Sequence, residues 1–171
     1  SEKSDPTGDT PKITITGDKG IGVGNENVLN VYDTDIVSSE EEVVTVSVVE
    51  DGEANFKNSA VDKMTNEGDL SMEYTANKDI TTQVTGSGDA ALTTDATVNW
   101  TPTTTAVQDT FTFNGNGHVV LGGAGFTGDI INNMTGDTLV ISTTITGDVD
   151  SSSDLENHVQ IVDGGSVSGQ I

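Results

Sequence analysis

Residues 42–50 read Glu-Val-Val-Thr-Val-Ser-Val-Val-Glu and run directly into Asp51-Gly52. β-Branched side chains such as valine lose rotamer freedom in helices and pack well on a pleated sheet, so this stretch predicts a strand. Glycine tolerates the positive φ that a tight hairpin turn requires, so Asp51-Gly52 predicts a hairpin after that strand. The stretch therefore favours antiparallel pairing of neighbouring strands.

Similar short runs recur along the chain at the spacing that is typical of a sandwich or barrel. We expect nine or ten short strands and at most one short helix, at Ser59–Asn66. The predicted strands are Lys12–Thr16, Val28–Tyr32, Glu42–Glu50, Leu70–Tyr74, Ile80–Thr85, Ala90–Trp100, Val107–Phe113, His118–Leu121, Thr138–Thr146 and His158–Val162. With no regular helices between the strands, a parallel βαβ fold is excluded. The predicted fold class is all-β, an antiparallel β-sandwich of the single jelly-roll type.

The length of 171 residues suits one well-buried domain. Residues 1–11 contain two prolines and almost no apolar side chains, so we expect a flexible N-terminal arm there. Residues 12–171 are then one β-sandwich domain. The chain has no apolar run long enough to cross a bilayer, and its first residues lack the apolar stretch of a signal peptide.

The tripeptide Thr-Gly-Asp occurs five times, and this raises the alternative of a β-solenoid. The copies are Thr7–Asp9, Thr16–Asp18, Thr127–Asp129, Thr135–Asp137 and Thr146–Asp148. The last three start eight and eleven residues apart, whereas a solenoid is expected to repeat at a fixed period. We therefore interpret the repeats as turn chemistry in a sequence rich in these residues.

The net charge of −22 excludes several classes of partner. The chain has 28 acidic residues against six lysines, and all six lysines lie in residues 1–78. Such a charge destabilises a compact chain at low ionic strength, but molar salt reduces the Debye length to about 3 Å. The composition therefore indicates adaptation to concentrated salt. It also argues against nucleic-acid binding, which depends on a basic patch.

Candidate catalytic and cofactor-binding residues are few. The chain has no cysteine and no arginine, which removes the parts for most nucleophilic and phosphoryl-transfer sites. Its two histidines, His118 and His158, belong to no recognisable nucleophile motif, and we interpret both as ordinary residues at strand starts. The Gly20–Gly24 run is not followed by a helix, so it does not predict a phosphate-binding loop. We predict no catalytic residues, no cofactor and no enzymatic activity.

Two acidic segments are candidates for cation binding, because hard cations prefer several closely spaced carboxylates. One is Asp148-x-Asp150 with Asp154, in the polar loop 148–154, and the other is Asp33-x-Asp35 ahead of Glu40–Glu42. Neither fits the twelve-residue EF-hand pattern. We interpret both as solvated loops and predict no metal site, while a Ca²⁺-dependent binding module stays an alternative function.

In its size, acidity, lack of cysteine and all-β patterning, the chain resembles the small single jelly-roll major capsid proteins of icosahedral, internal-membrane viruses that infect halophilic archaea. The resemblance covers the whole chain in composition and strand count and includes no motif. It implies a capsid shell subunit of a virion, packed into capsomers with copies of itself or with a paralogous subunit, in high salt or with bridging cations. The alternative assembly role is an extracellular filament or surface-layer subunit of a halophile.

Overall fold

The computed structural model describes residues 12–15, 20–38, 44–136, 138–151 and 159–171. Within these ranges the regular structure consists of strands, and no helix is present, including none that could span a membrane. The prediction of a helix at Ser59–Asn66 is wrong: Val61 makes an isolated bridge to Ile36, and Lys63–Asn66 is strand β7. The predicted arm at residues 1–11 and residue His158 lie outside the described residues.

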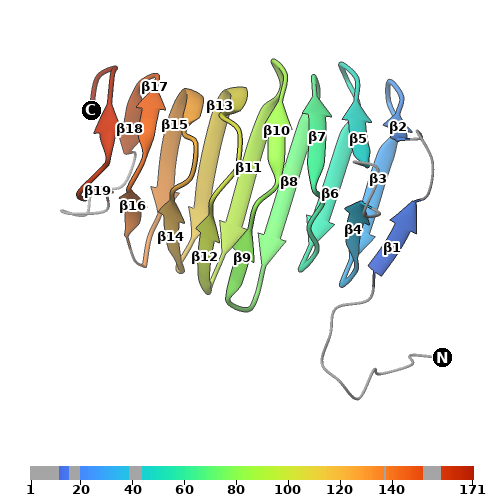
Figure 1. Ribbon diagram of the computed structural model, residues 1–171, viewed down its shortest axis with the longest axis horizontal. Coiled ribbons are helices and arrows are strands. Elements are labelled where there is room, and N and C mark those ends of the chain that lie inside the picture. The colour runs from blue at the N-terminus through green and yellow to red at the C-terminus, as the bar shows by residue number, and fades with distance from the viewer. Residues whose placement is uncertain (1–11, 16–19, 39–43, 137, 152–158) are drawn as a thin grey trace.

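The prediction of an antiparallel jelly-roll sandwich is also wrong, because the described strands pair in parallel. Most strands pair with the equivalent strand of the next coil, as in β6 with β8 and β8 with β11. The chain is thus a β-solenoid, in which successive coils stack along one axis. The strand colours run in chain order along that axis from β1 to β19 (Figure 1).

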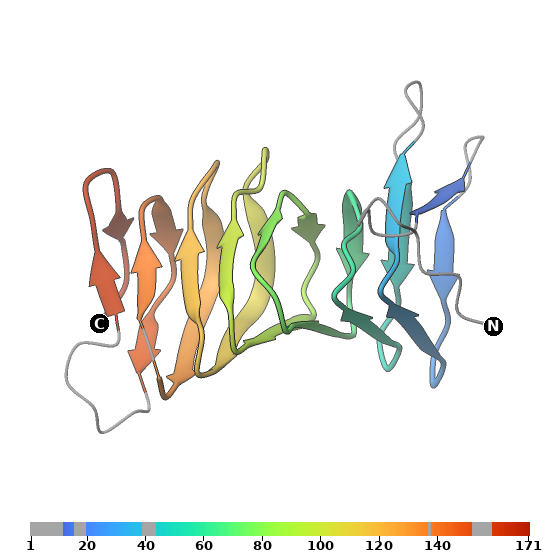
Figure 2. The ribbon, with the colours of Figure 1, turned by 90° about the horizontal axis from the view of Figure 1, so that it is seen from below.

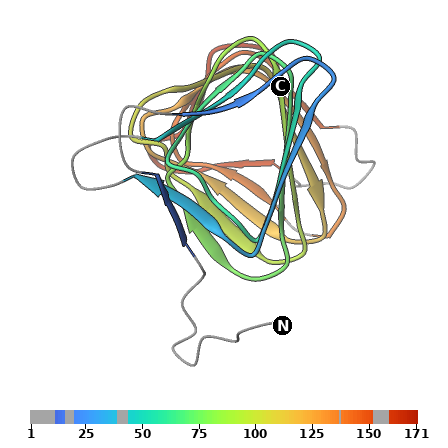
Figure 3. The same cartoon turned by 90° about the vertical axis from the view of Figure 1, so that its right-hand side faces the viewer.

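Each coil passes through up to three strand positions, and these make three faces around one interior (Figure 3). The long face contains β3 (Val28–Tyr32), β6 (Glu53–Lys57), β8 (Asp69–Tyr74), β11 (Asp89–Thr94), the later parts of β13 (Ala106–Gly115) and β15 (Phe126–Met134), and β18 (Val149–Ser151). The second face contains β1 (Lys12–Ile15), β4 (Asp35–Ser38), β9 (Lys78–Ile80), β12 (Thr97–Trp100), β14 (His118–Leu121), β16 (Leu139–Ile141) and β19 (Val159–Ile161). The third face contains β2 (Ile21–Val23), β5 (Thr45–Val48), β7 (Lys63–Asn66), β10 (Gln83–Thr85), the first two residues of β13 (Ala106 and Val107) and of β15 (Phe126 and Thr127), β17 (Thr144–Thr146) and β20 (Ser166–Val167).

The valine-rich stretch forms a strand as predicted, but the turn after it is a corner between two faces. Strand β5 lies on the third face, between β2 and β7, whereas β6 lies on the long face, between β3 and β8. Asp51 has a φ of 60° at this corner. A residue with positive φ therefore redirects the chain into another sheet instead of reversing it beside β5. Seen from below, the coils follow one another in chain order along the axis (Figure 2).

The coils differ in length, which is why the chain shows no fixed period. Stacked residues on the long face are 25, 16 and 20 positions apart in Asn30–Asn55, Lys57–Glu73 and Asp69–Asp89, and 19 apart in Asn114–Asn133. The rejection of a solenoid on irregular spacing is therefore wrong.

Two of the Thr-Gly-Asp copies nevertheless mark equivalent corners. Thr127 pairs with Thr146 in adjacent coils, and Gly128 and Gly147 that follow them have φ of 134° and 149°. A Cβ on Gly147 would collide with the backbone of Gly128, so both corners need glycine.

The interior is packed with the inward-facing half of each alternating strand. Three aromatic rings, one from each face, meet there in edge-to-face contacts: Trp100 of β12, Phe111 of β13 and the Phe126 end of β15. Their ring centroids are 5.2–5.8 Å apart, and all three side chains are buried. The indole N–H of Trp100 donates to the carbonyl of Thr82 at 3.0 Å. The core is thus built across faces, and the outer surfaces of the faces are free for other roles.

Candidate functional site

The long face carries a row of acidic side chains at the starts of its strands. Glu53 stands opposite Asp69, and Asp69 stands opposite Asp89, in three successive coils. All three side chains are exposed, and adjacent strands lie about 4.8 Å apart. Like charges that stand directly opposite each other destabilise a sheet, so this row is a source of electrostatic strain that salt relieves.

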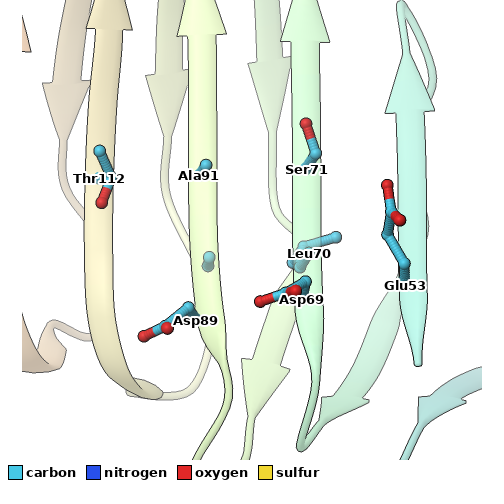
Figure 4. Close-up of a pocket in the computed structure, with 8 residues that line it drawn as sticks. Glu53, Asp69, Leu70, Ser71, Asp89, Ala91 and Thr112 are labelled. Carbon is cyan, nitrogen blue, oxygen red and sulfur yellow. The ribbon is translucent and has the colours of Figure 1, made fainter. Parts of the chain in front are cut away.

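A shallow hollow of about 360 Å³ lies beside this row (Figure 4). Its floor is formed by the small outward side chains of Ser71, Ala91 and Thr112, and the acidic row forms one border. The surface is rich in hydrogen-bond acceptors and can concentrate cations. Its acidic residues are exposed on the sheet.

A smaller hollow of about 130 Å³ lies on the second face. At this point the coil that contains β5 and β6 contributes no strand, only the isolated bridge at Val61. The ammonium group of Lys78 reaches across that coil to the carboxylate of Asp35, at 3.2 Å, and Asp35 also accepts the N–H of Ala60 at 2.8 Å. The hydroxyl of Thr82 lines this hollow and has no hydrogen-bond partner in the structure, although it is buried. The ion pair thus links β4 to β9 at the place where the coil between them contributes no strand to this face.

Acidic side chains at the corners act as acceptors between coils. The carboxylate of Asp95 accepts the N–H of Asn116 at 3.2 Å, and Asp129 accepts the N–H of Asp148 at 3.0 Å. Asp148 in turn accepts the N–H of Gln170 at 2.7 Å. Backbone donors at corners have no strand partner, so these carboxylates satisfy them and tie each coil to the next.

Three of the four described cation-binding candidates act as acceptors between coils. Asp148 is one of the corner acceptors, Asp33 accepts the side-chain amide of Asn58 at 3.0 Å, and Asp35 pairs with Lys78. Asp150 is exposed on β18, while Asp154 and Glu40–Glu42 lie outside the described residues. Among the described side chains, no group of three or more histidine or acidic residues is placed to hold a metal ion.

The remaining residues considered from the sequence lie apart from one another. His118 is the first residue of β14 and is half-buried on the second face, and the stretch Ile21–Val23 of the glycine-rich run is strand β2 on the third face. The structure therefore brings none of these residues into a common site.

The feature that the sequence did not suggest is the outer surface of the third face. Its central column consists of small hydroxyl side chains and one valine, in two groups that are each in register: Ser47, Thr65 and Thr85, and then Val107, Thr127 and Thr146. A second column, two residues earlier in each strand, includes Thr45, Lys63, Gln83, Thr144 and Ser166. These side chains are exposed or half-buried, so the face presents a regular array of hydroxyl and methyl groups.

The third face also differs from the rest of the protein in charge. Its eight strand segments contain no acidic residue, and Lys63 is their one charged residue. Acidic residues occur only at its borders, for example Asp62 and Asp109. The third face is made of two hydrogen-bonded groups, β2–β5–β7–β10 and β13–β15–β17–β20, which lie next to each other. In a protein with a net charge of −22, the described strand segments of this face thus carry no acidic residue.

Signals for this face exist in the sequence as short pairs such as Thr144 and Thr146, Ser166 and Ser168, or Thr45 and Ser47. Each pair is unremarkable alone, and only the parallel register places the pairs side by side.

Comparisons of the chain with models of protein families, with curated proteins and with solved structures found no match.

Proposed function

We propose that this chain is a structural subunit of an ordered assembly that forms in concentrated salt, outside the cell or in a virion. The observation that carries the proposal is the third face, whose eight strand segments lack acidic residues in a chain with a net charge of −22. Strong like charge keeps copies of a protein apart. A surface without acidic residues on such a protein is where a close contact has the lowest electrostatic cost.

Between the two assembly roles, the fold favours a filament or surface-layer subunit. A solenoid stacks its coils in one direction and offers long, flat faces that run along its axis. The capsid role followed from a resemblance to jelly-roll proteins, and it loses that support because the described strands form a solenoid. A capsid shell built from this chain would have to form by lateral packing of these faces.

A Ca²⁺-dependent binding module is the less favoured function. The acidic residues that suggested it, such as Asp35 and Asp148, already act as partners of Lys78 and of a corner N–H. Removal of divalent cations at constant ionic strength separates the two functions. An unchanged melting temperature contradicts the Ca²⁺ module, and a large fall supports it.

The assembly function is tested by sedimentation velocity and electron microscopy of the protein in molar KCl and in dilute buffer. We expect large, regular species in molar KCl that dissociate when the salt is diluted, because screening at about 3 Å removes the repulsion between copies. A protein that remains monomeric in molar KCl, at the highest concentration at which it is soluble, refutes the proposal.

A further inference from the structure

The third face has the geometry of a surface that can pack against a copy of itself. Its strands lie in parallel register at a spacing of about 4.8 Å, so a second copy offers the same spacing. Its central column is made mostly of threonine, with Val107 36% exposed in the middle. Small β-branched side chains on flat, in-register strands interdigitate well between two sheets, which then pack about 10 Å apart.

The charge distribution selects this face over the other two. On the long face, two copies would oppose their rows of exposed acidic side chains, including Asp69 and Asp89. The second face carries Asp79 on its outer surface, next to Asn99. Among the three faces, only the third can approach an identical face without placing carboxylates opposite carboxylates.

The size of the face sets the strength of the contact. Eight strand segments span seven strand spacings, or about 34 Å, and a width of four residues is about 13 Å. Two such faces would bury about 900 Å² in total, below the range of about 1,200–2,000 Å² for stable complexes. A single pair of faces is therefore a weak contact, which becomes stable when many copies are held together in an assembly.

We propose that the third face binds the third face of a second copy of this chain, through the threonine columns and with the coils in register. This inference rests on the assembly function proposed above and names the contact that produces it. The partner is thus the chain itself, and molar salt permits the contact by screening the acidic borders of the face.

The test adds charge to the third face and, in a matched control, to the long face. The variant Thr65→Asp/Thr127→Asp places two carboxylates in the central column, on β7 and β15. The control Thr93→Asp/Thr112→Asp makes the same two substitutions at outward positions of β11 and β13. Both variants change the net charge equally, and circular dichroism checks that each is folded.

Sedimentation in molar KCl should show at least about a tenfold loss of association for the third-face variant, because two like charges per copy become buried in the contact. The long-face control should associate like the wild type. If the wild type associates and the third-face variant does so equally, the inference is refuted while the assembly function stands. If the wild type does not associate at all, both are refuted.

A charge-exchange experiment covers the case in which the aspartate variant folds poorly. The variant Thr65→Lys/Thr127→Lys lowers the net negative charge, so it should associate more strongly than the wild type if only overall repulsion matters. Burial in a face-to-face contact predicts weaker association instead. Mixing the lysine and aspartate variants should restore association, since opposite charges then meet across the contact. A failure of the mixture to associate, while the wild type does, contradicts the inference.

Discussion

Neutralising one member of the acidic row should stabilise the protein in dilute salt and have almost no effect in molar salt. The best position is Asp69, because it stands opposite Glu53 on one side and Asp89 on the other. Its carboxylate is exposed on the outer surface of β8. The substitution Asp69→Asn keeps the size of the side chain and removes two like-charge contacts at once.

The magnitude follows from the spacing of the strands. Like charges directly opposite each other cost about 0.2–1 kcal/mol per pair, so loss of two such pairs should raise the free energy of unfolding by about 0.4–2 kcal/mol. For a chain of this length each kcal/mol corresponds to about 2–4 °C in melting temperature. In molar salt the Debye length of about 3 Å is shorter than the strand spacing of about 4.8 Å, so the gain should nearly vanish.

Thermal unfolding followed by circular dichroism, in dilute buffer and in molar KCl, measures both values. The control is Asp163→Asn, which removes the same charge from an exposed turn outside the paired strands. If Asp69→Asn stabilises no more than Asp163→Asn in dilute buffer, the repulsion along the row is not the cause. A gain that persists unchanged in molar KCl refutes the electrostatic reasoning as well.

Three further predictions concern the corner at Gly147, the buried Tyr74 and the aromatic core at Phe111. Gly147→Ala should lower the free energy of unfolding, measured in urea, by about 1–3 kcal/mol, because any residue other than glycine is strained at a φ of 149°. The control Gly22→Ala should change it little, because the new Cβ has open space around it. Burial, with a smaller contribution from the charge of Asp35, raises the pKa of Tyr74 above its ordinary value. The neutral phenol therefore stabilises the folded protein fully below about pH 10, the pKa in the unfolded chain. This stability is lost as the pH rises toward the higher pKa in the folded protein. Tyr74→Phe should flatten that alkaline fall in denaturant-unfolding curves, and an unchanged fall would rule out Tyr74 as its source. Phe111→Ala should cost about 3–5 kcal/mol and change the fluorescence of Trp100, whose ring centroid lies 5.8 Å away. A loss below about 1 kcal/mol, closer to the value for a surface residue, would contradict a packed aromatic centre.

The positions of many strands could be predicted from the sequence, because alternation of apolar and polar residues depends only on the strand itself. Val28–Tyr32 and His118–Leu121 are strands with the predicted bounds. Longer predicted runs such as Ala90–Trp100 turned out to be two strands, β11 and β12, on different faces. The local pattern identifies a half-buried strand but not the point at which the chain bends around a corner.

The direction of pairing could not be predicted in this way, because parallel and antiparallel strands with one buried face share the same alternation. The one local sign of pairing, Asp51-Gly52, favoured a hairpin, yet a residue with positive φ serves a solenoid corner equally well. The decisive sign was present in Thr127 and Thr146, which are 19 residues apart and stack in adjacent coils. The copy at Thr135 lies between them and divides that interval into eight and eleven, which concealed it.

The structure also changes the meaning of the acidic composition. The net charge of −22 indicated a general adaptation to salt, but the folded protein distributes its acidic residues unevenly. Some, such as Asp129 and Asp148, are needed as acceptors at the corners, and others, such as Asp69 and Asp89, form the row on the long face. The third face receives none, although it is assembled from eight separate segments of the chain. Salt adaptation alone favours carboxylates on every exposed surface, so a face that excludes them needs a separate cause, and contact with another surface supplies one.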